Sequence, residues 1–280
     1  MLRHLHRLGR RWFSRTSIEA GEGDPFLVYA IGDIHGEIAA LDCLLRRIVA
    51  DAATRPEVLP ELVFLGDYVD RGADSRAVVE RLSGLALPGF TLHTLMGNHE
   101  AAMLDFLADP GRGASWLAYG GAETLVSYGV RASFGISDPA RCQELRDQLL
   151  ARLPDHHWEF LKGLLPQVVL GDYLFVHAGI RPGRSIAAQR PEDVLWIREP
   201  FLSSRRRHEK VVVHGHTVTE QPELLSNRIG IDTGAFATGT LTAVALSENN
   251  PRLLQVFRKD WMVLSEDSRH QPPEKYCIPL

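Results

Sequence analysis

The chain has 280 residues, of which 45% are hydrophobic and 24% are charged, a balance typical of a globular protein with a sizeable core. Its 24 glycines and 16 prolines follow no period, which excludes collagen-like and low-complexity chains. A formal charge of −4 argues against nucleic-acid binding over the whole surface, and no uncharged apolar run reaches the roughly 18 residues that a transmembrane helix needs. The 3 cysteines are far apart, so we expect no disulfide framework and a reducing, cytoplasmic location.

Residues 1–25 differ in composition from the rest of the chain. Arginines recur from the start and no acidic residue precedes Glu19, while Leu5, Leu8 and Trp12 would share one face of a helix. Two interpretations stay open. The segment is a basic, flexible tail, or it is an amphipathic segment that contacts a membrane surface or an acidic partner, or that directs the chain to an organelle.

From residue 26 onward, apolar β-rich runs alternate with segments of helical periodicity. The first expected elements are the strand Phe26–Ile31, the helix Glu37–Val49, the strand Leu62–Leu65, the helix Arg76–Leu85 and the strand Thr91–Met96. Strand–turn–helix units that recur about every 30 residues indicate βαβ construction. Residues 98–165 are expected to be mostly helical.

After Pro166 the pattern becomes rich in strands. The expected strands are Gln167–Leu170, Tyr173–Val176, Val211–His214, Arg228–Ile231, Thr240–Leu246 and Leu253–Phe257. No repeat of whole modules and no strong linker interrupts the pattern. We therefore predict one α/β catalytic domain over residues 26–260, followed by a C-terminal extension over residues 261–280.

Short polar clusters follow several of the expected strands. They are GDIHG at 32–36, GDYVDRG at 66–72, GNHE at 97–100, HAG at 177–179 and HGHT at 214–217. In open α/β sheets the loops beyond the carboxyl ends of the strands build the active site, so we expect these clusters to meet. Side chains two residues apart on an extended segment point the same way, and Asp33 and His35 can thus converge on one ion. The pattern predicts a metal site with mixed oxygen and nitrogen ligands.

In this order the clusters resemble the motifs of metallophosphoesterases. The chain is most similar to the serine/threonine protein phosphatases of the phosphoprotein phosphatase family, in their compact bacterial and phage form. Two flanking signatures match as well, LWIRE at 195–199 and IDTG at 231–234. The resemblance covers about residues 26–246. It implies an α/β fold of four layers, α/β/β/α, with a central β-sandwich.

The resemblance also implies a centre of two divalent metal ions. The implied ligands are Asp33 and His35 for the first ion, Asp67 between the ions, and Asn98, His177 and His216 for the second. A shared carboxylate offsets the repulsion between two cations, and a hydroxide that bridges the ions would attack phosphorus directly and in line. We expect manganese, although iron or zinc would also fit these ligand types.

Four more residues would act on the substrate by the same resemblance. Arg71 and Arg198 resemble the family's phosphate clamps, because a guanidinium fork matches phosphate oxygens; a surface ion pair is the alternative role for each. His99 resembles the proton donor to the departing alkoxide, and Asp70 would orient its ring.

Three further features of the sequence each allow two interpretations. His214 lies two residues before His216, as in metallophosphoesterases that bind metal with both histidines, but the phosphatases most similar here use only the histidine of Gly-His-Thr, so we place His214 outside the ligand set. The basic run at 205–207 either holds acidic phosphopeptides or is a solvated loop. The Gly120–Gly121 region resembles a helical insertion that caps the cleft, or it simply packs between helices.

These features together predict a metal-dependent phosphomonoester hydrolase, with a protein serine/threonine phosphatase acting on phosphorylated proteins or peptides as the first choice. The alternative enzyme is a symmetrical dinucleoside tetraphosphate hydrolase. That branch departs from the pattern at the place of Asp70 and has Asp where this chain has Glu100, which disfavours it. A non-catalytic scaffold is a more remote alternative, because the whole implied site is intact. No nucleophile-elbow or Walker motif supports a serine hydrolase or an NTPase.

Overall fold

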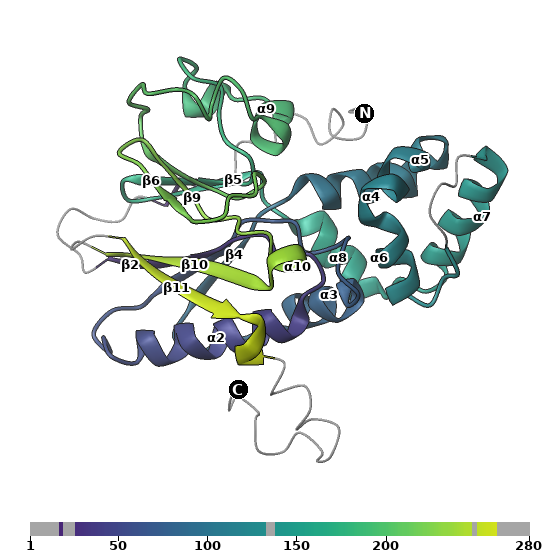
Figure 1. Ribbon diagram of the computed structural model, residues 1–280, viewed down its shortest axis with the longest axis horizontal. Helices are drawn as coiled ribbons and strands as arrows, with labels where there is room; N and C mark the ends of the chain where they lie inside the picture. Colours follow the sequence, from purple (N-terminus) through teal and green to yellow (C-terminus); the bar gives the residue numbers. More distant parts are fainter. Residues whose placement is uncertain (1–16, 19–25, 133–137, 248–250, 262–280) are drawn as a thin grey trace, which may run out of the picture.

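The computed structural model describes residues 17–18, 26–132, 138–247 and 251–261. These residues form two β-sheets that pack face to face, with helices on the outer faces (Figure 1). Most of the predicted basic tail, and the predicted C-terminal extension beyond residue 261, lie outside the described residues. Within the described part of the chain, no helix is both long and apolar enough to cross a bilayer.

The five-stranded sheet has the order β11-β10-β2-β3-β4. Its strands are β2 (Leu27–Ile31), β3 (Glu61–Phe64), β4 (Thr91–Thr94), β10 (Thr240–Ser247) and β11 (Arg252–Phe257). The strands β2, β3 and β4 are parallel, as the βαβ pattern predicted, while β10 and β11 continue the sheet in antiparallel pairs. All of β2 is buried because each face of the sheet is covered.

The six-stranded sheet has the order β1-β5-β6-β7-β9-β8. Its strands are β1 (Ser17–Ile18), β5 (Gln167–Leu170), β6 (Tyr173–Val176), β7 (Val211–His214), β8 (Glu223–Leu224) and β9 (Arg228–Gly230). The strands β6, β7 and β9 are parallel, so their carboxyl ends lie at the same edge. The short strands β1 and β8 were not predicted, because two-residue strands leave no alternation in the sequence.

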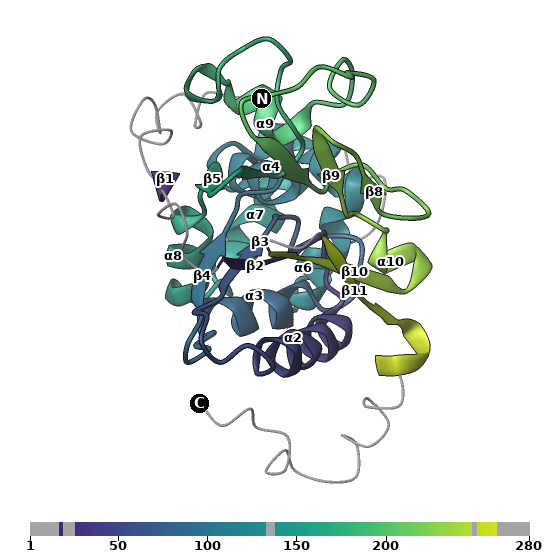
Figure 2. The same cartoon turned by 90° about the vertical axis from the view of Figure 1, so that its left-hand side faces the viewer.

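The two sheets share an apolar interface. It contains Val28 and Ala30 of β2, Val63 of β3, Val213 of β7 and Ile229 of β9, all of them buried. The opposite faces of both sheets pack against helices, so the layers run helix, sheet, sheet, helix (Figure 2). This arrangement confirms the predicted four-layer α/β/β/α architecture with its central β-sandwich.

Helices cover the outer faces and one end of the sandwich. The longer ones are α2 (Ile38–Ala52), α3 (Ser75–Ser83), α4 (Asn98–Ala108), α6 (Ala122–Ser127), α7 (Pro139–Leu150), α8 (Asp155–Gly163) and α9 (Pro191–Trp196), and the shortest are α5 (Gly113–Trp116) and α10 (Ala235–Thr238). The helix α2 lies beneath the five-stranded sheet, α9 lies above the six-stranded sheet, and α4 to α8 gather at one end (Figure 1). That end is next to the carboxyl ends of β2, β3 and β4.

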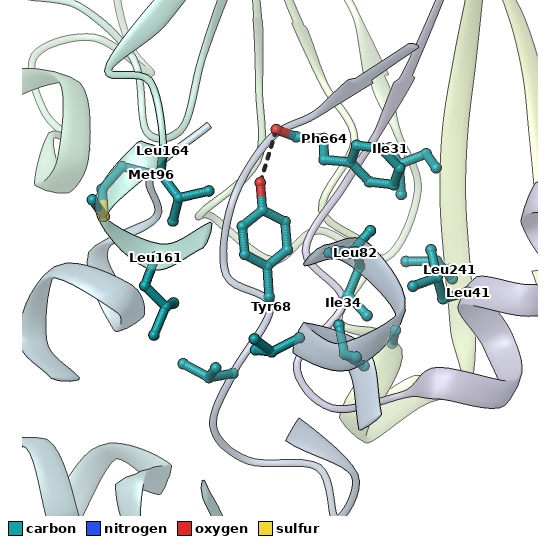
Figure 3. Packing of buried hydrophobic residues seen from close by; sticks show 14 of the residues in the cluster. Ile31, Ile34, Leu41, Phe64, Tyr68, Leu82, Met96, Leu161, Leu164 and Leu241 are labelled. Atoms are coloured by element: carbon teal, nitrogen blue, oxygen red, sulfur yellow. Dashed lines mark hydrogen bonds between the residues drawn. The ribbon is translucent and has the colours of Figure 1, made fainter. Parts of the chain in front are cut away.

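Tyr68 anchors the loop after β3 in the core. Its ring is fully buried, and its hydroxyl donates to the backbone oxygens of Leu95 at 2.7 Å and Phe64 at 3.3 Å. Figure 3 shows the ring between Leu161 on one side and Leu82 and Ile34 on the other. Because Phe64 ends β3 and Leu95 follows β4, this one side chain links two strand ends and fixes the polar loop beyond them.

Candidate metal centre

The six predicted metal ligands lie together at the carboxyl ends of strands from both sheets. Asp33 and His35 follow β2, Asp67 follows β3, Asn98 begins α4 just after β4, His177 follows β6, and His216 follows β7. All six are buried, although each is polar or charged. Burying so many polar groups together is costly unless they bind one another or a shared ligand.

Asp67 lies at the centre of this cluster. Its Oδ2 is 3.5 Å from Nε2 of His35 and 3.4 Å from Nε2 of His177. It belongs to two overlapping groups of possible ligand atoms, one with His35 and His99 and the other with His177 and His216. With metal–ligand distances of about 2.0–2.2 Å, two ligands of one ion stand about 3–3.5 Å apart, which matches these separations. The carboxylate of Asp67 is therefore placed to belong to two ion sites at once.

Asn98 brings the second group of atoms together. Its Oδ1 is 2.8 Å from Nε2 of His177 and 2.7 Å from Nδ1 of His216. The other ring nitrogen of His177, Nδ1, donates to the backbone oxygen of Leu65 at 2.9 Å. If the His177 ring is neutral, its one proton is on Nδ1, and Nε2 carries a lone pair. This lone pair faces those of the Asn98 oxygen, and no proton lies between the two atoms. A cation between these atoms resolves that arrangement.

Burial favours the neutral form of the histidines among the predicted ligands. His35 uses Nδ1 to donate to the backbone oxygen of Val69 at 2.8 Å, which leaves Nε2 free for a metal. Burial lowers the pKa of His35 to about 3, against the attraction of Asp67, and burial lowers the pKa of His216 to about 2. The Nε2 atom of His216 has no hydrogen-bond partner among the described residues. The donor set therefore fits divalent metal ions.

A second carboxylate lies beside the first ligand cluster. Asp33 accepts hydrogen bonds from the backbone N–H of His216, at 3.0 Å for Oδ2. Burial, followed by the nearby carboxylates of Asp232 and Asp67, raises the pKa of Asp33 well above its usual value. Positive charge in this site would stabilise the charged form of these three buried carboxylates. Asp232 comes from the IDTG signature and was not among the predicted site residues.

The backbone is strained at the same positions. Among the described residues the non-glycine residues with positive φ are His35, Asp67, Asp70, Arg71 and His216, with φ between 46° and 73°. L-residues rarely adopt this left-handed conformation, and such strain gathers at functional sites. Every one of these residues is a predicted ligand or catalytic residue.

Two glycines allow the loops to approach the carboxylates. A Cβ atom on Gly97 would lie 2.2 Å from Oδ1 of Asp67, and one on Gly215 would lie 2.0 Å from Oδ1 of Asp33. Both contacts are far too short, so any side chain would displace the ligand. This explains why glycine precedes Asn98 and His216 in their motifs.

His99 and Asp70 form a buried pair beside the cluster. The Nδ1 atom of His99 is 2.7 Å from Oδ2 of Asp70, and the Nε2 atom of His99 is 3.9 Å from Oδ2 of Asp67. Although burial alone would lower it, the carboxylates of Asp67 and Asp70 raise the pKa of His99 to about 9. Trp116 and Thr124 donate to the two oxygens of Asp70, at 2.8 and 2.6 Å. The ring of His99 is therefore fixed by Asp70 at the edge of the site, with Nε2 turned toward Asp67.

The two predicted phosphate clamps flank the cluster and remain exposed. The Nη2 atom of Arg71 is 3.4 Å from Nε2 of His99, and its guanidinium stacks 4.6 Å from the ring centroid of Phe236. Arg198 approaches the backbone oxygen of His216 at 3.5 Å. Within the described residues neither arginine has a carboxylate partner, so both forks are available to an anion.

Glu100 has a role that the motif alone did not reveal. Its carboxylate accepts hydrogen bonds from the backbone N–H groups of Asp67, Tyr68, Val69 and Gly97, at 2.7–3.1 Å. It is fully buried at the start of α4. A single side chain thus holds the loops that carry Asp67 and Asn98. A Glu three residues after a helix N-cap is the signal that could have indicated this.

The three open features now have places in the structure. His214 is buried outside both groups of possible ligand atoms, with its ring against Phe201. The basic run at 205–207 is exposed on a loop. The insertion contacts the site, because the backbone oxygen of Gly120 accepts from the N–H of Arg71 at 3.2 Å.

Residues 26–235 match the calcineurin-like phosphoesterases, and the chain belongs to this family of metallophosphoesterases. It is 26% identical over 238 residues to the asymmetrical bis(5'-nucleosyl)-tetraphosphatase PrpE of Anoxybacillus flavithermus, a match that covers 78% of this chain and 89% of that protein. It is 28% identical over 229 residues to serine/threonine-protein phosphatase 2 of Escherichia coli, over 77% of this chain and 90% of that protein. The resemblance predicted from the motifs is confirmed.

Solved structures agree with the fold. A protein provisionally assigned as a diadenosine tetraphosphatase has a TM-score of 0.59 at 21% identity, over 86% of this chain and 97% of its own. A mutant cold-active protein tyrosine phosphatase has a TM-score of 0.56 at 17% identity, over 89% of this chain and 82% of its own. The relatives carry different activities in their names, and what they share is phosphate-ester hydrolysis of the metallophosphoesterase type.

Proposed function

We propose that this chain is a protein serine/threonine phosphatase that uses two divalent metal ions, with manganese as the first choice. The observation that carries the proposal is the buried pair of His99 and Asp70, at 2.7 Å, beside the ligand cluster. The buried free cysteines Cys43 and Cys142 fit a reducing, cytoplasmic location.

The pair matters because substrates differ in their leaving groups. A serine or threonine alkoxide is a strong base and needs a proton as it departs, whereas a phosphate leaving from a tetraphosphate chain is stable without one. His99 would supply that proton from its place beside Asp70 and Asp67, and hydrogen bonds from Trp116 and Thr124 fix Asp70. A site that positions a proton donor through several hydrogen bonds favours phosphomonoesters of alcohols.

The remaining residues would bind metal and phosphate. Asp33, His35, Asp67, Asn98, His177 and His216 would hold the ions. When bound, the ions supply Lewis acidity and an activated water nucleophile for direct in-line attack. Arg71 and Arg198 would hold the phosphoryl oxygens, because their planar forks match them and stabilise the charge that spreads over them during transfer.

Hydrolysis of dinucleoside tetraphosphates is the second candidate. It is favoured by the names of one relative and of one structural neighbour. The sequence predicts a symmetrical enzyme as the alternative, whereas this relative is named an asymmetrical one. The two types differ in their products, because a symmetrical cut of diadenosine tetraphosphate gives ADP alone and an asymmetrical cut gives ATP and AMP.

A substrate panel tests the proposal. The enzyme, reconstituted separately with manganese, iron or zinc, is assayed on phosphoserine, phosphothreonine and phosphotyrosine peptides and on diadenosine tetraphosphate, with product analysis. We expect the highest kcat/KM on the phosphoserine or phosphothreonine peptide. A higher value on diadenosine tetraphosphate would overturn the proposal, and its products would identify the cut. Loss of all activity with two ions bound would favour the scaffold alternative.

A further inference from the structure

A pocket of about 220 Å³ lies beside the ligand loops, between the segment that follows α9 and the strands β7 and β9. Its rim includes Glu199 and Thr217, and its inner wall includes His214, Arg228 and Gly230. Glu199 directly follows the predicted clamp Arg198, and Thr217 directly follows the predicted ligand His216. The pocket therefore includes the residues that directly follow two residues of the proposed site.

The inner wall comes from one face of the six-stranded sheet. In the parallel pair of β7 and β9, His214 is opposite Gly230 and Val212 is opposite Arg228. Paired residues and residues two apart share a face, so His214 and Arg228 both point to the outer side of this sheet. The ring of Phe201 contacts both of them. Gly230 leaves the space between them, since a Cβ there would lie 3.1 Å from the His214 ring.

Unsatisfied polar atoms concentrate in this pocket. Among the described residues, ten buried side-chain nitrogen or oxygen atoms lack a hydrogen-bond partner, and four of them belong to the lining: Nε2 of His214, Oγ1 of Thr217, and Nε and Nη1 of Arg228. His214 is 1% exposed and Arg228 is 4% exposed. Buried donors and acceptors left unpaired cost about 1–3 kcal/mol each, so a cluster of them indicates a ligand.

The free atoms define the ligand's chemistry. Arg228 uses Nη2 to donate to Glu223 at 2.9 Å, and its nitrogens Nε and Nη1 remain free to donate to an acceptor in the pocket. The Nδ1 atom of His214 faces the backbone oxygen of Gly215 at 3.1 Å, so it carries the proton and leaves Nε2 as an acceptor. The pocket thus offers donors on one residue and an acceptor on its neighbour.

We propose that this pocket is a specificity subsite for a planar group that carries a hydrogen-bond acceptor next to an N–H donor. A carboxamide side chain of a phosphopeptide and the edge of a nucleobase both have this chemistry. The proposal rests on the proposed phosphate hydrolysis at the neighbouring metal centre. A substrate whose phosphate binds between Arg71 and Arg198 would extend past Glu199 and place its next group against Arg228 and His214.

Matched substrates test the two sources of such a group. One arm compares phosphothreonine peptides that differ only in Gln, Glu or Leu, scanned through the positions beside the phosphoresidue. The other arm compares ATP with inorganic tripolyphosphate. Each kcat/KM is divided by that for p-nitrophenyl phosphate, which lacks a second group and reports the metal centre alone. We expect a preference of about tenfold or more for the amide or the nucleotide in one arm.

Two variants assign that preference to the pocket. Gly230→Ala fills the space beside His214, and Arg228→Lys keeps the charge but removes the planar fork. Both should bring the preference close to one, while the control Gly163→Ala, where a Cβ meets nothing within 4 Å, should retain it. Absence of a preference in both arms, or a preference that survives both variants in folded protein, would overturn the proposal.

A binding measurement separates this proposal from the proposed function. In ¹⁵N-histidine-labelled protein, the Nε2 resonance of His214 should shift when AMP or the Gln-containing peptide is added, and Gly230→Ala should abolish the shift. An unchanged resonance with both probes would overturn the subsite even if the enzyme is an active phosphatase. A shift in a protein that hydrolyses no phosphopeptide would retain the subsite and reject the protein phosphatase.

Discussion

The carboxylate of Glu100 accepts the backbone N–H of Asp67 at 2.9 Å, so the residue after the Asn-His motif positions the central carboxylate of the ligand cluster. Glu100→Gln replaces one acceptor oxygen with a donor that faces other donors. We expect a loss of about 3 kcal/mol in the free energy of unfolding, measured by urea denaturation. The exposed Glu159→Gln should change it by less than about 0.5 kcal/mol. Equal stabilities for both variants would reject this role of Glu100.

Asp67→Asn tests the shared carboxylate. The substitution keeps the size of the side chain and removes the negative charge between His35 and His177, which lie 3.5 and 3.4 Å away. Two cations would then face each other without an anion between them, so metal content by elemental analysis should fall below two ions and activity should fall with it. A variant with two tightly bound ions and full turnover would contradict the two-metal assignment.

His216 and His214 make a matched pair on one loop. His216 contacts the Asn98 oxygen at 2.7 Å, whereas His214 lies outside both groups of possible ligand atoms. His216→Ala should therefore lose one of the two ions, and His214→Ala should keep both. Elemental analysis of the two folded variants measures this. The reverse pattern would move the last metal ligand to His214.

Asp51 offers a test of the fold far from the centre. It joins α2 to β11 through two hydrogen bonds from Arg252 at 2.8 Å each, and these lower the pKa of Asp51 to about 2. A carboxyl whose folded pKa is depressed stabilises the protein above its unfolded pKa of about 4, and that contribution disappears as the pH falls toward 2. Asp51→Asn should cost about 2 kcal/mol at pH 7.

The control for Asp51 is Asp172→Asn, since the Asp172 side chain is 94% exposed and should contribute little. The free energy of unfolding, measured against pH, should differ between wild type and Asp51→Asn at pH 7 and converge between about pH 4 and pH 2. A difference that persists at pH 2 would show that the side chain acts through packing and not through charge.

The sequence predicted the architecture well where the pattern is local. Alternating apolar runs gave β5, β6 and β7 with the observed bounds, because each strand is short, apolar and followed by a polar turn. In the βαβ part, β2 ends at Ile31 as predicted, but β3 and β4 end one and two residues earlier than predicted. At β4, Leu95 and Met96 continue the apolar run after the ladder ends. The motifs identified the family, and the structure then brought all six implied ligands together.

Long-range contacts were beyond the sequence pattern. Trp116 and Thr124 donate hydrogen bonds to Asp70 although they lie 46 and 54 residues further along the chain, and local sequence periodicity cannot predict contacts over such separations. Asp232 lies in the IDTG signature at 231–234, but its spacing from the other predicted ligands did not mark it as a site residue. The pocket beside the site also escaped prediction, because it depends on Gly230 lying opposite His214 across two strands.

The proposed role of His99 is to donate a proton to the leaving oxygen, so substrates with different leaving groups should respond differently to its loss. His99→Asn removes the acid and keeps a polar side chain, while Asp67, the other ligands and both arginines stay. Loss of a general acid costs roughly 10²–10⁴ in rate. Asp70→Asn should give a milder loss of the same kind, because it disturbs only the orientation of His99. Arg71→Ala should slow all substrates alike, because they share the phosphoryl oxygens.

The measurement is kcat/KM on a phosphoserine peptide and on an aryl phosphate, for wild type and the three variants, with metal content checked. For His99→Asn we predict a large loss on the peptide, whose alkoxide must be protonated, and a distinctly smaller loss on the aryl phosphate, whose oxide departs unaided. Equal losses on the two substrates would contradict the proton-donor role and reassign His99 to phosphate or metal binding.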